Sequence, residues 1–102
     1  MVDPSVPKQY ELLGPTIEAL LALGGSAAIH AINKKVIEQQ SYSPRQLAAL
    51  HGVGKGTELA YQLAWARTIL HKIGAVTNPR RGVWAVTEYG QNATDSQLVD
   101  AS

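Results

Sequence analysis

Apolar residues recur at three- and four-residue intervals along most of this chain, which is the spacing of a helix with one buried face. The first such segment contains Ile17, Leu20 and Leu21. It is expected to begin near Pro15, since proline suits the first turn of a helix, and to end at the Gly24-Gly25 pair. The pattern predicts an amphipathic helix close to the start of the chain.

Two further helices are expected before the middle of the chain. Ser26 can cap a helix that reaches about Gln39, because a serine hydroxyl accepts a hydrogen bond from an N–H group of the first turn. The Ser43-Pro44 pair places a cap before a first-turn proline and predicts a short third helix. The apolar stripe of the second helix consists of Ile29, Ile32 and Val36.

The longest predicted helix follows a cap at Thr57 and runs to Ile73, where Gly74 ends it. Its inner stripe consists of Leu59, Leu63, Ala66 and Leu70. Its outer face consists of Thr57, Tyr61, Ala64, Thr68 and Lys72. This outer face is small, polar and aromatic, unlike the alternating acids and bases of a helix that only faces water, and it indicates a binding surface.

The segment from Val76 to Val86 predicts two strands joined by a tight turn, since β-branched and aromatic residues flank Pro79 and Gly82. Thr87 can cap a last short helix. Helices followed directly by such a hairpin give the element order of a winged helix-turn-helix, mainly α-helical with a small β-hairpin as the wing. We assign residues 1–9 to a flexible arm, 10–93 to this domain and 94–102 to a flexible tail.

Basic charge is concentrated in the second half of the chain. From Arg45 to Gly90, six Lys and Arg residues stand against two Glu residues, a sum of +4, while residues 1–44 sum to −1 and the tail to −2. A basic half favours a polyanionic partner. Arg80 and Arg81 at the tip of the hairpin, anchored by Trp84 at its base, are expected to contact phosphate groups.

Composition narrows the class of protein further. The chain has no cysteine, so its fold depends on no disulfide and nothing argues for secretion. Its apolar runs are too short for a membrane span, and no signal peptide is evident. A cytoplasmic protein of one domain, with no membrane contact, is expected.

Tyr61 to Gly90 resembles the N-terminal winged-helix domain of Mrr-type restriction endonucleases. Matching residues lie in the long helix, its exit, the wing and the closing turn: Trp65, Ala66, Arg67 and Leu70; Ile73, Gly74 and Val76; Pro79, Arg81, Gly82 and Trp84; Val86, Thr87 and Gly90. The likeness covers roughly Tyr10 to Gly90 and is loosest between Gly25 and Gly56. It implies DNA binding in a restriction system, with plain and methylated DNA both open as targets.

One departure from that family concerns catalysis. Restriction enzymes of this type continue into a nuclease domain, whereas this chain ends at Ser102. The resemblance therefore implies no cleavage by this chain, and it implies a nuclease or other effector domain as a partner, in cis or in trans.

The long helix has the geometry of a recognition helix, whose N-terminal side chains reach base edges in the major groove. The base-reading candidates are Thr57, Glu58, Tyr61, Gln62 and Thr68. The phosphate-contacting candidates are Lys55, Lys72, Arg80 and Arg81. Arg67 is open between a structural ion pair and a phosphate contact, and Trp65 and Trp84 are expected to be buried anchors.

Other chemistries find little support in the sequence. The GVGKG segment, residues 52–56, lacks the first glycine and the hydroxyl residue of a nucleotide-binding loop. His30, His51 and His71 lie on different elements without metal-ligand spacing, so no metal, cofactor or catalytic group is expected. A protein-docking or dimerising winged helix, including a homodimer, is the alternative function, because fold alone does not decide function.

Overall fold

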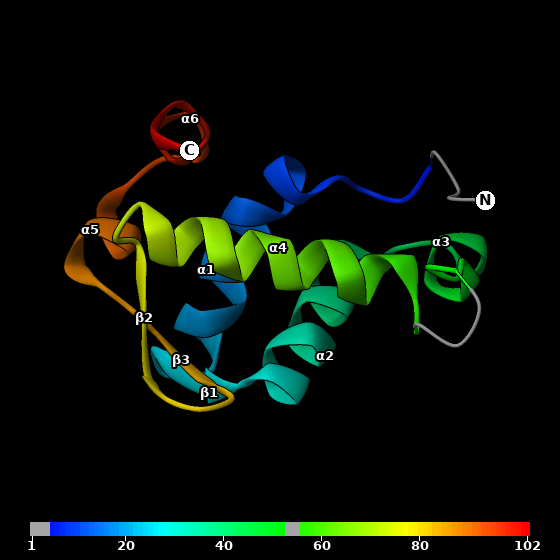
Figure 1. Cartoon of the computed structure of the whole chain (residues 1–102), viewed down its shortest axis with the longest axis horizontal. Coiled ribbons are helices and arrows are strands. Elements are labelled where there is room, and N and C mark those ends of the chain that lie inside the picture. Colours follow the sequence, from blue (N-terminus) through cyan, green and yellow to red (C-terminus); the bar gives the residue numbers. More distant parts are fainter. Residues whose placement is uncertain (1–4, 53–55) are drawn as a thin grey trace.

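A computed structural model of the chain describes residues 5–52 and 56–102. It is mainly helical, with a small antiparallel sheet (Figure 1). The elements in chain order are η1 (Gln9–Leu12), a 3-10 helix, α1 (Leu13–Ala22), β1 (Ser26–Ala28), α2 (Ile29–Gln40), α3 (Pro44–Ala48), α4 (Glu58–Lys72), β2 (Val76–Arg80), β3 (Val83–Val86), α5 (Glu88–Asn92) and α6 (Asp95–Ala101). This order is that of a winged helix-turn-helix, which confirms the predicted fold class.

Helices α1, α2 and α4 enclose the core, and the predicted stripes of α2 and α4 supply much of it. The fully buried aliphatic side chains include Leu12, Leu13, Leu20, Ile32, Val36, Leu59, Leu63 and Leu70. Ile29 is only half-buried, because it lies where the sheet meets α2. The predicted inner face of α4 is confirmed, and it fixes which face of that helix points outward.

Local chemistry accounts for the ends of several helices. The Thr57 hydroxyl accepts from the N–H of Ala60 at 3.1 Å, and the Ser43 hydroxyl accepts from the N–H of Gln46 at 3.1 Å. Helix α1 ends at Gly24, whose φ of 92° is in the left-handed region that glycine adopts without steric cost. These boundaries agree with the sequence prediction.

The sheet holds a strand that the sequence did not indicate. Ser26 was expected to cap α2, but Ser26–Ala28 forms β1 and pairs antiparallel with β3, with Ala27 opposite Trp84. The strand order is β1-β3-β2, so β3 is central and β2 is an edge. Tertiary pairing with β3 imposes the extended conformation on these small residues, and α2 begins only at Ile29.

The C-terminal residues form a helix instead of the flexible tail we expected. The Thr94 hydroxyl accepts from the N–H of Gln97, and the Gln97 amide oxygen accepts from the N–H of Thr94 at 2.8 Å, which is a capping box. Leu98 of this helix, α6, is buried in the core, where α6 packs against α1. In the N-terminal arm, Val6 is buried in the same core.

No helix within residues 5–52 and 56–102 is both long enough and apolar enough to cross a membrane.

Candidate nucleic-acid interface

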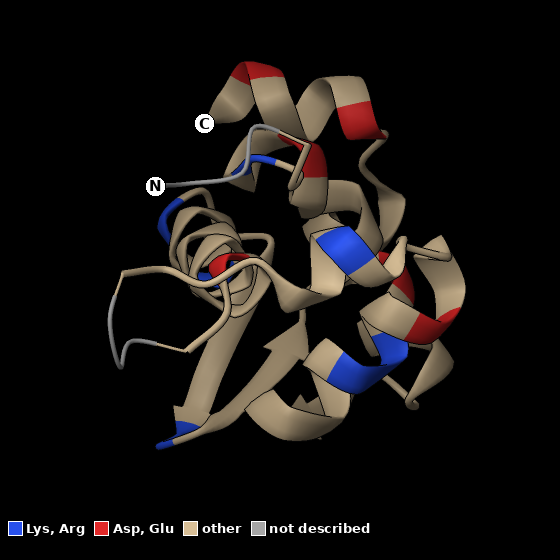
Figure 2. Cartoon of the chain, turned by 90° about the vertical axis from the view of Figure 1, so that its right-hand side faces the viewer, with Lys and Arg blue, Asp and Glu red and all other residues tan. Residues whose placement is uncertain are grey.

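The wing projects from the helices as a short hairpin with two cations at its tip (Figure 2). Its turn consists of Arg81 and Gly82, and Gly82 has a φ of 77°, which requires the conformational freedom of glycine. The Asn78 amide nitrogen donates to the carbonyl oxygens of Arg80 at 2.8 Å and Val83 at 2.6 Å, across the tip. Both arginines are exposed, on a tip that hydrogen bonds hold closed.

Pro79, which was expected to help form this turn, lies within β2 instead. The edge position of β2 tolerates a residue without an N–H group, and the pairing of β2 with β3 is irregular between Thr77 and Arg80.

The wing is also tied to the first turn of α2. The N–H of Ile29 donates to the Gly82 carbonyl oxygen at 3.0 Å. The cap residue of α2 is Ala28, whose side chain accepts no hydrogen bond from the helix. The positive end of a helix dipole and the two wing arginines therefore lie at the same edge of the molecule, an arrangement that favours phosphate.

The outer face of α4 is aromatic and apolar. Tyr61 is 38% exposed and Trp65 is 45% exposed, and with Ala64 and Thr68 they line a hollow of about 210 Å³. The expectation that Trp65 is a buried anchor is wrong. Trp65 is four residues after Tyr61, so the two side chains lie on the same face of the helix. The sequence spacing alone could therefore have predicted that Trp65 is exposed.

Two of the base-reading candidates are in the interior. Glu58 is 1% exposed and Gln62 is 7% exposed. The Gln62 amide donates to Glu58 Oε2 at 2.6 Å, and its oxygen accepts from the N–H of Gln9 at 2.9 Å. The segment around η1 covers this flank of α4, so neither side chain is presented to a base, and we remove both from the candidate set.

Glu58 also contacts a histidine that the sequence prediction had not included in the site. Its Oε1 lies 2.6 Å from His51 Nδ1, and the His51 ring stacks on Tyr61 with centroids 3.6 Å apart and planes inclined by 11°. Burial raises the pKa of the Glu58 carboxyl, but the hydrogen bonds with Gln62 and His51 outweigh it and leave that pKa below its usual value. No local sequence signal connects His51 with Glu58, because the two meet only across the connection before α4.

The remaining candidates occupy separate positions. The Thr57 hydroxyl is used as the cap of α4, and Thr68 is exposed with its hydroxyl donating to the Ala64 carbonyl at 3.1 Å. Lys72 is exposed, but it lines a hollow with Ala101 and Ser102. In Figures 1 and 2 α6 lies at the top and the wing tip at the bottom, so Lys72, which borders α6, is not grouped with the wing arginines. Lys55 lies outside the described residues.

Arg67 has a structural role in this fold. It is 5% exposed, and its guanidinium donates to Asn33 Oδ1 of α2 at 2.8 Å. The sequence leaves Arg67 open between a structural ion pair and a phosphate contact; its hydrogen-bonding partner in the fold is an amide and not a carboxylate. Burial lowers the pKa of Arg67, yet an arginine stays charged under all ordinary conditions.

Trp84 lies at the base of the wing, as expected, and is half-buried against the core. The ring of His71 from α4 meets it edge-on, with centroids 5.8 Å apart. Because Trp84 is on the central strand of the sheet, this contact joins the wing to the C-terminal half of α4.

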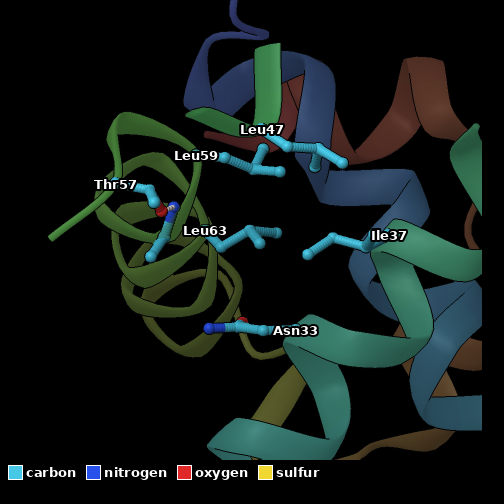
Figure 3. Close-up of a pocket in the computed structure, with 7 residues that line it drawn as sticks. Asn33, Ile37, Leu47, Thr57, Leu59 and Leu63 are labelled. Atoms are coloured by element: carbon cyan, nitrogen blue, oxygen red, sulfur yellow. Dashed lines mark hydrogen bonds between the residues drawn. The ribbon is translucent and has the colours of Figure 1, made fainter. Parts of the chain in front are cut away.

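A second hollow, of about 170 Å³, separates α2 and α3 from the N-terminal half of α4 (Figure 3). Leu63 of α4 and Ile37 of α2 point toward one another across it in Figure 3. Asn33 and Thr57 are the polar residues that line it. None of the described residues that line it is ionisable, so these residues offer no acid or base. In the part of the chain that the structure describes, no group of three His, Asp or Glu side chains could hold a metal ion.

Comparison with known proteins identifies the family. A family model described as the Mrr N-terminal domain matches residues 10–96, which is most of the chain. No curated protein and no solved structure matches the chain. The matched range includes α4 and the whole wing, where the resemblance in the sequence is densest. The chain belongs to the family of Mrr N-terminal domains.

Proposed function

We propose that this domain binds double-stranded DNA as the target-recognition module of an Mrr-like restriction system. The observation that carries the proposal is the wing tip, where Arg80 and Arg81 are both exposed on a turn closed by hydrogen bonds. Cations in a fixed position beside a helix N-terminus bind the phosphate backbone of DNA and displace the counterions condensed on it, which favours binding. The effector that cuts or otherwise acts on the DNA is then a nuclease or other domain, in cis or in trans, in the cytoplasm.

The outer face of α4 is the surface we propose for the major groove. Glu58 and Gln62 are internal, so Tyr61, Trp65 and Thr68 are left to meet base edges. An apolar hollow between these side chains suits a methyl group in the groove, whether it belongs to thymine or to a methylated base. This surface therefore favours readout by shape and apolar contact over paired hydrogen bonds.

The wing is tested by changing Arg80 and Arg81 together to alanine and titrating salt against affinity for a duplex. The slope of log affinity against log salt should fall by about one to two, equally for plain and methylated duplexes. Lys35→Ala is the charge control, because Lys35 is already paired with Glu38 at 3.0 Å. A folded double variant with unchanged slope and affinity would refute the role of the wing.

A specific observation also supports the alternative of a protein-docking module. The described outer positions of α4 from Thr57 to Thr68 carry no charge, and Trp65 is among the most exposed large apolar residues. Such a face suits a partner protein or a second copy of this chain. Sedimentation of the parent and of Trp65→Ala in the absence of DNA tests this alternative, since a dimer formed through this face would be lost when the indole is removed, whereas a DNA-binding monomer would sediment unchanged.

A further inference from the structure

His51 is held beside the outer face of α4 by a hydrogen bond to Glu58, a ring stack on Tyr61 and a backbone hydrogen bond to Gly56. Its Nδ1 is 2.6 Å from Glu58 Oε1, its ring stacks on Tyr61 with centroids 3.6 Å apart, and its backbone N–H donates to the Gly56 carbonyl oxygen at 2.9 Å. Glu58 in turn accepts from Gln62, which accepts from the N–H of Gln9. A continuous chain of hydrogen bonds thus runs from η1 through the interior to this imidazole.

The carboxylate determines which ring nitrogen is free. Since the pKa of Glu58 is lowered, Glu58 is a carboxylate near neutral pH and accepts only, so Nδ1 of His51 carries the hydrogen in that bond. Imidazoles as a class gain and lose a proton between about pH 5 and pH 8. With the hydrogen of the neutral ring on Nδ1, Nε2 is the nitrogen that accepts in the neutral ring and donates in the imidazolium.

The position of the ring suits a ligand as well as a structural role. The His51 side chain is 30% exposed, while Glu58, its partner, is 2% exposed. The stack fixes the ring plane against Tyr61, which is on the face proposed for the major groove. This partial exposure leaves the imidazole accessible from solvent at the edge of the face proposed for the major groove, which is where a phosphate of bound DNA is expected.

We propose that His51 is a phosphate-contacting residue, positioned by Glu58 and Tyr61, and that it makes the affinity for duplex DNA depend on pH. The inference rests on the proposed function. Among the described residues, the charged and titratable groups around His51 are Glu58 and Tyr61 of α4, and Lys8, whose charge acts on Glu58. In proteins generally, ammonium groups and phenols keep their charge state between about pH 5.5 and 8, whereas imidazoles change theirs in this range.

The test measures affinity for one duplex at about pH 5.5 and about pH 8, each over a range of salt. The parent should bind about tenfold more weakly at the higher pH, as expected for loss of a charge-assisted hydrogen bond, with a salt slope shallower by about one. His51→Gln should remove both differences. His30→Gln and His71→Gln, the matched controls at the two other histidines, should keep them.

Glu58→Gln tests the positioning role, because the amide preserves the shape but removes the negative charge that fixes Nδ1–H. It should reduce the pH-dependent part of binding while the pH-independent part, supplied by the wing, remains. Each variant is used only if it melts as a folded domain.

The possible failures are distinguishable. If no duplex binds at either pH, the proposed function is wrong and this inference with it. If the parent binds with the same slope at both pH values, or if His51→Gln keeps the difference, the inference alone is overturned.

Discussion

Replacing Gly90 with alanine is expected to destabilise the domain strongly, although alanine is the better helix former. Gly90 is in the middle of α5, and it packs directly on the backbone of Ala75, in the connection between α4 and β2. A Cβ atom there would lie 2.1 Å from the Ala75 carbonyl oxygen and 2.9 Å from its carbon. That carbonyl accepts from the N–H of Thr87 at 3.0 Å and Ala75 is fully buried, so neither side can move away cheaply.

The magnitude follows from two opposing contributions. Overpacking of a well-packed interior costs about 1–3 kcal/mol, and more when the clash is with backbone. The gain in helix propensity from glycine to alanine is about 1 kcal/mol and offsets part of it. Because the clash here is with a buried backbone carbonyl, the cost is expected at or just above the top of that range, about 3–4 kcal/mol, which leaves a net loss of about 2–3 kcal/mol. That loss in the free energy of unfolding corresponds to a melting temperature lower by roughly 10–20 °C in a domain of this size.

Gly14 provides the matched control, since it is also helical and buried. A Cβ atom at Gly14 would meet the Asp95 carboxylate at 2.3 Å, but Asp95 is an exposed side chain that can swing aside. Gly14→Ala should therefore stay within about 1 kcal/mol of the parent. Thermal and urea unfolding followed by circular dichroism give both values. Equal losses for the two variants would show that the packing argument is wrong.

The remaining predictions concern the two tryptophans and Glu58. Trp84→Ala should lower the free energy of unfolding by about 2 kcal/mol, because the Trp84 ring is half-buried. Trp65→Ala should change it by less than about 1 kcal/mol, because Trp65 is exposed. Unfolding curves in which Trp65→Ala is the less stable variant would contradict both assignments. Because the pKa of Glu58 is lowered on folding, its contribution to stability is present above its ordinary pKa of 4.5 and is lost as the pH falls through the folded value. Urea unfolding from pH 7 down to about pH 3 should therefore show a loss of stability that is smaller in Glu58→Gln.

The elements that the sequence predicted correctly are those with strong local chemistry. Thr57 caps α4, Gly82 occupies the left-handed position in the wing turn, and Thr87 caps α5 with its hydroxyl 3.1 Å from the N–H of Gly90. Each of these depends on residues within a few positions along the chain. The order of the helices and the hairpin then followed, and with it the fold class.

Features that depend on distant partners were not predictable in the same way. The Ser26–Ala28 segment has no preference for a strand, and it is extended because β3 offers it a pairing edge. For α6 a local signal did exist in the Thr94 and Gln97 capping box, but its stability also needs Leu98 in a pocket made by α1. A helix of seven residues would be marginal on its own.

In the candidate site, helical periodicity predicted some of the buried residues of α4 but not all of them. The spacing of Leu59, Leu63 and Leu70 correctly gave the direction of the buried face. It did not give the width of that face, because η1 and His51 cover the flank that holds Glu58 and Gln62. Polar residues beside a stripe are assigned to the surface by default, and only the partners supplied from elsewhere in the chain reverse the assignment.

Burial of Glu58 and Gln62 changes what kind of recognition the domain can perform. The wing supplies exposed charge, while the described outer face of α4 supplies Tyr61, Trp65 and small residues. Charge contacts weaken as salt rises, since they depend on counterion release, but apolar contacts with methyl groups do not. If α4 enters the groove, affinity and selectivity therefore come from separate surfaces, of which only the wing is sensitive to salt. The proposed phosphate contact of His51 would join the two surfaces, because its ring stacks on Tyr61 of the aromatic face.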